Sequence, residues 1–168
     1  LQQAARESIN QVIRDAAAAA GIAPAEILEV TVGGNTVMNH LLVGRDPRYL
    51  EMVDADVPRH PFVFRTASLG IEAHPRAYCY CLPNVSRFVG GDAVGDVLAS
   101  GMHGRPEVSL LIDLGTNGEI VVGNREWLAA VSCASGPAFE GAGIGAGMRA
   151  MRGAIEHVAI DPVSGEAT

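Results

Sequence analysis

The segment between Leu110 and Val122 places the strongest constraint on the fold of this 168-residue chain. Two apolar stretches flank the polar sequence Asp-Leu-Gly-Thr-Asn-Gly at positions 113–118. Short apolar stretches on either side of a glycine-containing turn are typical of a β-hairpin. A second glycine turn and a third apolar stretch follow directly. We therefore expect a meander of three strands, at residues 108–112, 119–122 and 126–131.

The turn at the tip of this hairpin carries residue types that suit phosphate binding. Successive backbone N–H groups in such a turn can bind phosphate oxygens without a cationic side chain, and Gly115 and Gly118 permit a close approach. Thr116 adds a hydroxyl donor, and Asn117 completes the tip. Asp113 could hold Mg²⁺ through water. The alternative interpretation is an ordinary hairpin with an Asx-type turn.

The charged residues exclude several functions. All 12 basic residues are arginines, against 19 acidic residues, for a net charge of −7. Without lysine, the chain can form neither a Walker-type P-loop nor a Schiff base. The acidic balance also disfavours a nucleic-acid partner, because no basic surface is available to neutralise phosphates.

Glycine is concentrated in the second half of the chain, where 14 of the 20 glycines lie between Gly90 and Gly153. This distribution indicates tight turns and close backbone approach, either to a ligand or only between packed elements. The alternating glycines of residues 141–147 lack the Gly-x-Gly-x-x-Gly spacing, so a dinucleotide-binding fold is disfavoured. We expect this run to pack a helix or loop closely against the sheet.

The first 44 residues follow an α/β pattern. We expect a helix over 1–20 that stops at Gly21, a buried strand over 27–32, a turn at 33–34, and a helix capped by Asn35 or Thr36. The second helix should end at Gly44. One face of the first helix is expected to be buried, consisting of Ala5, Ile9, Val12, Ile13, Ala16 and Ala20.

The middle of the chain is less regular. Four prolines interrupt residues 45–76, which we interpret as a long surface excursion with one turn near Tyr49. A strand is expected over 77–82, then a helix with Asp92 at or near its N-cap. We expect a hinge or domain boundary at residues 101–106 and a further strand over 154–160.

Cysteine and histidine usage gives no sign of a metal site or a disulfide framework. Three cysteines favour a reducing cytoplasm, and we expect Cys79 and Cys81 to be buried free thiols on one strand face. The five histidines show no ligand spacing, so none is assigned to a metal. No apolar run reaches the length of a membrane span.

Four motifs in a fixed order, together spanning about residues 5–160, resemble those of one family. The family is that of the reductive activators of corrinoid proteins and their ferredoxin-linked relatives. It belongs to the actin-like superfamily, together with sugar and acetate kinases and ATP-dependent chaperones. The motifs lie at residues 32–42, 82–92, 112–121 and 136–150.

The resemblance implies an α/β fold with actin-like, ribonuclease H-like lobes. Residues 1–104 would form the latter part of the first lobe with its crossing helix, and 105–168 the start of the second. It implies an ATP- and Mg²⁺-dependent reaction in which a [2Fe–2S] domain outside this chain reduces the cob(II)alamin of a corrinoid protein.

The resemblance also implies site residues. Asp92 would order the attacking water, with Gly90 and Gly91 beside the nucleotide, although Asp92 also suits a plain helix N-cap. Glu140 is interpreted as a solvated loop residue. One departure is local, because relatives read Val-Gly-Asn-Thr where this chain has a second glycine, Gly34.

The chain begins with Leu1 inside a helical pattern, so we interpret it as an internal piece of a larger protein. The iron–sulfur cysteines and a second phosphate hairpin are missing, so the isolated piece is expected to bind little ATP. Two alternatives stay open at this point. One is another actin-like phosphotransferase for a sugar or carboxylate, and the other is a non-catalytic interaction or dimerisation module, for example in a homodimer.

Overall fold

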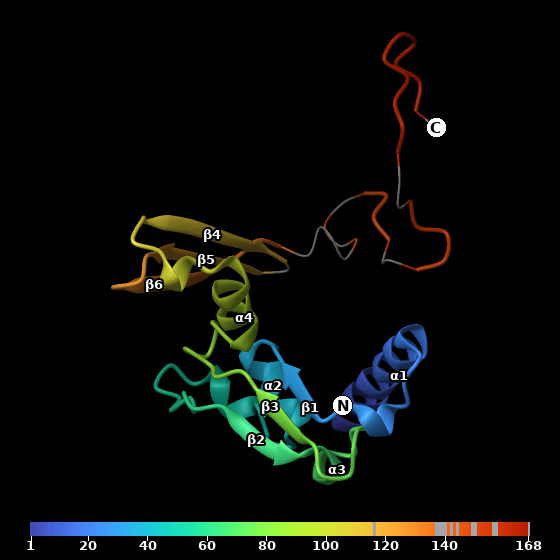
Figure 1. Ribbon diagram of the computed structural model, residues 1–168. Helices are drawn as coiled ribbons and strands as arrows, with labels where there is room; N and C mark the ends of the chain where they lie inside the picture. Colours follow the sequence, from blue (N-terminus) through green and yellow to red (C-terminus); the bar gives the residue numbers. More distant parts are fainter. Residues whose placement is uncertain are drawn as a thin grey trace. The chain divides into compact units, whose positions relative to one another are not determined.

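The computed structural model describes residues 1–115, 117–136, 141, 143, 145–148, 151–155 and 158–167 (Figure 1). Backbone contacts divide the chain into two units. The first unit consists of Leu1–Asp113 with Glu119–Ser132, and the second of Leu114–Gly118 with Cys133–Thr168. Thr116 and residues 137–140, which include Glu140, lie outside the described residues, so their expected roles stay predictions.

The first helix, α1 (Gln2–Ala20), ends as expected at Gly21, whose φ of 69° is left-handed. The predicted buried face was wrong in part. Asn10 and Ala17 are the buried residues, whereas Val12 is 66% exposed and Ala16 and Ala20 are also exposed. Ile9 and Ile13 are partly buried against the core cluster, as expected, and Asn10 takes a buried position beside them because its side chain is hydrogen-bonded.

The Asn10 side chain connects α1 to the turn at residues 70–72 through two hydrogen bonds. Its Nδ2 donates to the Gly70 carbonyl at 2.9 Å, and its Oδ1 accepts from the Glu72 N–H at 2.9 Å. An exposed ion pair between Arg14 and Glu72, at 2.6 Å, adds little to stability. The two-sided amide contact therefore explains why a polar residue occupies the buried side of the helix.

Replacing Asn10 with alanine is expected to lower the free energy of unfolding by about 2 kcal/mol, because two partly buried backbone groups lose their partners. Urea denaturation measures this change. The matched control is Gln3→Ala, which removes only an exposed side-chain hydrogen bond to Glu7. Equal stability of the two variants would contradict the role of Asn10.

The first sheet has the strand order β1-β3-β2, from β1 (Glu29–Val32), β2 (Phe62–Arg65) and β3 (Tyr78–Cys81). β1 runs parallel to β3, and β2 runs antiparallel to β3. β1 was expected to be buried, but its residues alternate between exposed and half-buried because it lies at the sheet edge.

The interpretation of residues 45–76 as a surface excursion was wrong. The expected turn near Tyr49 is present as the 3-10 helix η2 (Arg48–Glu51), but β2 and the short helix α3 (Thr66–Leu69) follow it. This segment supplies half of the core cluster, which consists of Leu42, Phe62, Leu69, Ile71, Cys79 and Cys81. As expected, Cys79 and Cys81 are fully buried free thiols.

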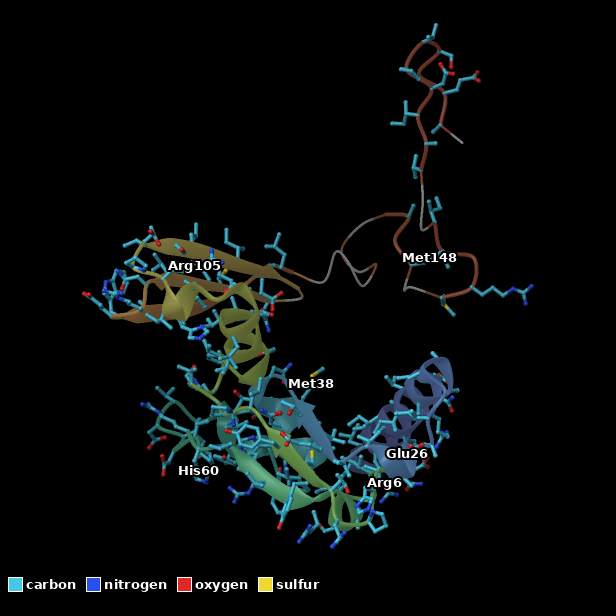
Figure 2. All side chains as sticks on the ribbon, in the orientation of Figure 1. Arg6, Glu26, Met38, His60, Arg105 and Met148 are labelled. Atoms are coloured by element: carbon cyan, nitrogen blue, oxygen red, sulfur yellow. The ribbon has the colours of Figure 1, made fainter. Side chains whose placement is uncertain are left out.

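Two helices of the first unit begin next to pairs of glycines, at positions 33–34 and 90–91. α2 (Thr36–Leu42) is capped by Asn35, one of the two expected caps, whose side chain accepts from the Met38 N–H at 2.9 Å. The Met38 side chain is 60% exposed on this helix (Figure 2). α4 (Gly91–Ser100) starts after its N-cap Gly90, with Asp92 in the first turn. Two 3-10 helices complete the first unit, η1 (Pro24–Glu26) and η3 (Met102–Gly104).

The second sheet confirms the meander, with the order β4-β5-β6. Its strands are β4 (Ser109–Leu114), β5 (Asn117–Gly123) and β6 (Leu128–Ala134), each longer than expected. In the later part, the described residues of 154–160 form no strand, and Ile160 only bridges Ala167. Of the glycine run, Gly141 lies close to the Met148 backbone, as close packing would require, whereas Gly143 and Gly145 have no atom of the described residues within 4 Å of a Cβ position.

Candidate functional site

Of the phosphate-binding residues predicted from the sequence, Gly115 directly follows β4, and Asn117 and Gly118 are the first residues of β5. The Gly115 N–H donates to the Asn117 carbonyl at 3.0 Å, so it closes the turn. Asn117 is exposed, and Gly118 is buried, with its carbonyl 3.4 Å from the Cys133 thiol. Apart from its chain neighbours, the described atom that a Cβ on Gly115 would approach is the Asn117 carbonyl oxygen, at 3.4 Å. Phosphate binding at this tip stays a prediction.

Three carboxylates come together in the first unit, on α4 and at the end of β4. Asp92 and Asp96 are four residues apart and so share one helix face. Burial raises the pKa of Asp96, and the negative charge of Asp113, its hydrogen bond to Asp113 and the charge of Asp92 raise it further. Asp113 lies within β4 rather than in the turn.

Asp96 was missed in the sequence reasoning. Its spacing from Asp92 was the available signal, because residues i and i+4 of a helix are neighbours. Nothing in the sequence, however, indicates that Asp113 lies beside this helix. The proximity of Asp96 to Asp113 arises only when the chain folds, because Asp96 lies on α4 and Asp113 lies near the end of β4, 17 positions later.

The carboxylates fit a hydrated magnesium ion better than a directly bound metal. Within the described ranges, no three histidine, cysteine or acidic side chains are arranged to hold a metal ion. Asp96 and Asp113 face each other, and a cation beside them would reduce the repulsion between their negative charges. Mg²⁺ retains most of its water and commonly uses only one or two carboxylates. Asp113 and Asp96 are the residues that would hold it.

Replacing Asp96 with asparagine is expected to raise the melting temperature of the ligand-free protein at pH 7. A raised folded-state pKa means that ionised Asp96 opposes folding. This cost is absent below the ordinary aspartate value of 3.8 and develops as the pH rises through the higher folded-state pKa. The advantage of the variant should therefore vanish in acid.

Thermal unfolding at several pH values measures this effect, with Asp54→Asn at an exposed position as the control. An Asp96→Asn advantage that is independent of pH, or that grows in acid, would contradict the assignment.

Gly90 and Gly91 lie where α4 meets the rest of the first unit. A Cβ on Gly90 would come within 2.5 Å of the Thr36 nitrogen, and one on Gly91 within 2.8 Å of the Leu82 carbonyl oxygen. The Asp92 N–H donates to the Gly34 carbonyl at 3.2 Å. Close packing alone therefore accounts for both glycines, and the roles of Gly90, Gly91 and Asp92 at a nucleotide stay predictions.

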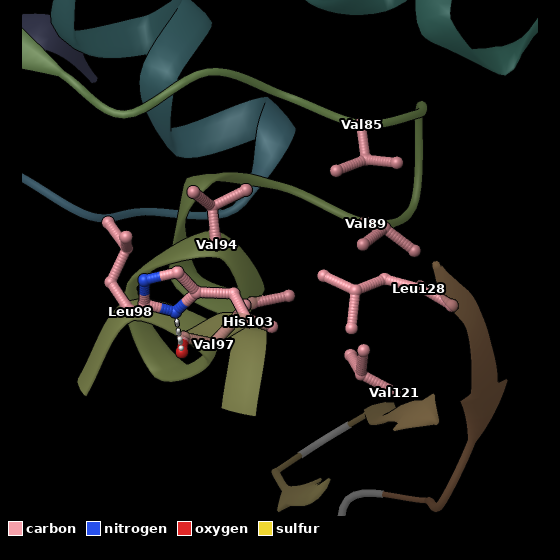
Figure 3. A pocket seen from close by; sticks show the side chains of 10 residues that line it. Val85, Val89, Val94, Val97, Leu98, His103, Val121 and Leu128 are labelled. Carbon is pink, nitrogen blue, oxygen red and sulfur yellow. Dashed lines mark hydrogen bonds between the residues drawn. The ribbon is translucent and has the colours of Figure 1, made fainter. Parts of the chain in front are cut away.

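An apolar cavity of about 350 Å³ lies beside α4, within the first unit (Figure 3). His103 lines it and is held by a 3.1 Å contact between its Nδ1 and the Val97 carbonyl. The cavity contains none of the three carboxylates, so its chemistry suits apolar groups rather than phosphate. Its other lining residues are Val85, Val89, Ala93, Val94, Val97, Leu98, Val121, Leu128 and Ala130.

Comparison with protein families decides the identity of the chain. Residues 1–105 match the model described as the RACo middle region, and residues 107–168 match the C-terminal domain of RACo, the ASKHA domain. The chain belongs to the RACo family. Its fold is mixed α/β, and residues 107–168 belong to an actin-like domain. The assignment of residues 1–104 to the first lobe stays a prediction.

Individual relatives are corrinoid activators. The chain is 32% identical to the corrinoid activation enzyme RamQ of Eubacterium limosum over 159 residues, which cover 94% of this chain and 26% of that protein. A second relative is the [Co(II) methylated amine-specific corrinoid protein] reductase of Methanosarcina barkeri. The two sequences are 40% identical over 73 residues, which cover 44% of this chain and 14% of that protein.

A solved structure agrees with these similarities. The structure of a reductive activator for corrinoid, iron-sulfur protein matches with a TM-score of 0.83 and 39% sequence identity, over 99% of this chain. The RACo family chain spans 27% of that structure and 26% of RamQ, about a quarter of either protein. Within the described residues, no helix is both long and apolar enough to cross a membrane.

Proposed function

We propose that this RACo family chain is part of an ATP-dependent reductive activator of a corrinoid protein. The similarity to a reductive activator along 99% of the chain is the observation that carries this proposal. The succession of a RACo middle region and an ASKHA domain supports it, because both matches follow the order of the sequence motifs.

The hairpin and Asp113 would bind the phosphates and the metal of ATP–Mg. Asp113 would accept hydrogen bonds from water around the metal, with Asp96 beside it, and the N–H groups and the Thr116 hydroxyl of the β4–β5 turn would donate to phosphate oxygens. Mg²⁺, when bound, neutralises charge that develops on the phosphates. Asp92 would position the attacking water.

The electron-transfer part of the function concerns regions outside this chain. We propose that a [2Fe–2S] domain elsewhere in the full-length protein supplies the electron and that the acceptor is the cob(II)alamin of a corrinoid protein. The similarity to activators of corrinoid proteins supports this partner. A homodimer and a cytoplasmic location complete the proposal.

Calorimetric titration of ATP into the full-length protein tests the nucleotide part. Saturable binding in the presence of Mg²⁺ is expected, and removal of the metal with EDTA should weaken the affinity about tenfold or more, because the phosphate charge is then left unneutralised. Absence of binding at millimolar ATP would refute the proposed ATP site. Equal affinity with and without Mg²⁺ would refute the role of the metal.

A further inference from the structure

The strand β1 leaves one edge of the first sheet open. In the order β1-β3-β2, β1 pairs with β3 along one edge, and no strand of the described residues pairs with its other edge (Figure 1). The N–H of Leu82, which directly follows β3, donates to the Val32 carbonyl at 2.8 Å, so the backbone of Val32 points toward β3. Because backbone groups alternate in direction along a strand, the N–H and C=O of Thr31 point to the open edge.

An apolar groove of about 380 Å³ lies between this strand and α1, within the first unit. Its apolar lining consists of Ile9, Val12 and Ile13 from α1 and of Val30 and Val32 from β1. Four of these side chains are only partly buried against the core cluster, and Val12 is 66% exposed. The groove therefore combines unburied aliphatic surface on two walls with the unpaired backbone of an edge strand.

We propose that this groove binds a further β-strand, supplied by another part of the same full-length polypeptide. The unpaired N–H and C=O groups of a strand edge are a template for another extended segment. A strand beside β1 would pair with the backbone of Thr31 and place alternate side chains in the groove. Those side chains would be aliphatic, because the walls that they contact are aliphatic.

The length of the relatives favours the same polypeptide as the source of this strand. The chain spans 27% of the solved reductive activator and 26% of RamQ, so most of a protein of that size lies outside it. A segment of the same polypeptide reaches the groove at an effective concentration of about millimolar, which a second copy or a separate protein rarely matches. The inference rests on the proposed function only in treating the chain as part of a longer activator.

Residue-resolved hydrogen exchange of the full-length protein tests the pairing, without nucleotide or corrinoid protein, so that its result is independent of the proposed activity. The reference is the Val30 amide, which points toward β3 as Val32 does. The Thr31 amide is expected to exchange within about tenfold of the Val30 rate at every protein concentration. Exchange at Thr31 that is about a hundredfold faster or more would show an open edge and overturn the proposal. Protection that appears only at high protein concentration, or only with an added partner, would overturn it as well.

Substitutions on α1 test whether the groove is filled. With an empty groove, Val12→Gln would be neutral or favourable, because glutamine favours a helix more than valine does. With an aliphatic strand in place, the amide group would be buried against it, and exchange of the α1 amides is expected to be about tenfold faster.

Ala18→Gln is the matched control, at an exposed α1 position that does not line the groove. Its α1 amides are expected to exchange within about twofold of the wild-type rate. Equal exchange rates in the two variants would overturn the proposal.

Discussion

Replacement of Gly90 with alanine is expected to destabilise the protein by about 3 kcal/mol or to prevent the first unit from folding. The new Cβ would come within 2.5 Å of the Thr36 nitrogen and 2.6 Å of the Asn35 Cα. Both are backbone atoms at the start of a capped helix, so no side-chain rotation relieves the overlap. Chemical denaturation of the full-length protein measures the loss.

Gly95 provides the matched control on the same helix. Among the described residues, the atom that its Cβ would meet is the Leu82 Cδ1, at an ordinary 3.4 Å. Gly95→Ala is therefore expected to be neutral or to stabilise α4 by up to about 1 kcal/mol, because alanine favours the helix more than glycine does. If Gly90→Ala were tolerated as well as Gly95→Ala, the close packing of α4 against the start of α2 would be refuted.

Replacement of Asp113 with asparagine is expected to lower the affinity for ATP–Mg at least about tenfold. The change keeps the shape of the side chain but removes the charge that would hold water around the metal. Calorimetric titration of the full-length variant measures the affinity. Asp54→Asn, which removes an exposed carboxylate of the same unit, should bind as the wild type does.

The two outcomes for Asp113 separate a structural from a ligand-binding role. Unfolding that is unchanged or shifted to higher temperature, together with weakened ATP–Mg binding, is the expected result, because the charge of Asp113 adds to the repulsion that Asp96 experiences. Unchanged ATP–Mg affinity would exclude Asp113 from the site, whatever the effect on stability.

Local signals in the sequence predicted several elements well. Gly21 as a helix stop, Asn35 as a helix cap and the meander of β4, β5 and β6 all depend on the chemistry of residues within a few positions. The family was also recognisable from the sequence, because four motifs in a fixed order carry more information than any one of them.

Features that depend on tertiary contacts were not predictable. The strand β2 is only four residues long and lies among prolines, yet its Phe62 joins the core because β2 pairs with β3. The burial of Asn10 follows from its contact with residues 70–72, and the raised pKa of Asp96 from its proximity to Asp113. Each involves partners at least 13 positions apart, the smallest separation being that of Arg65 and Tyr78.

The most direct test of the proposed function follows the corrinoid itself. Full-length protein, with the proposed iron–sulfur domain reduced, is mixed with a corrinoid protein in the cob(II)alamin state, and the absorbance of that state is recorded with and without ATP–Mg. The account predicts loss of cob(II)alamin that requires ATP–Mg and that Asp113→Asn slows about tenfold or more. Reduction at the same rate without ATP, or none in its presence, would contradict the account.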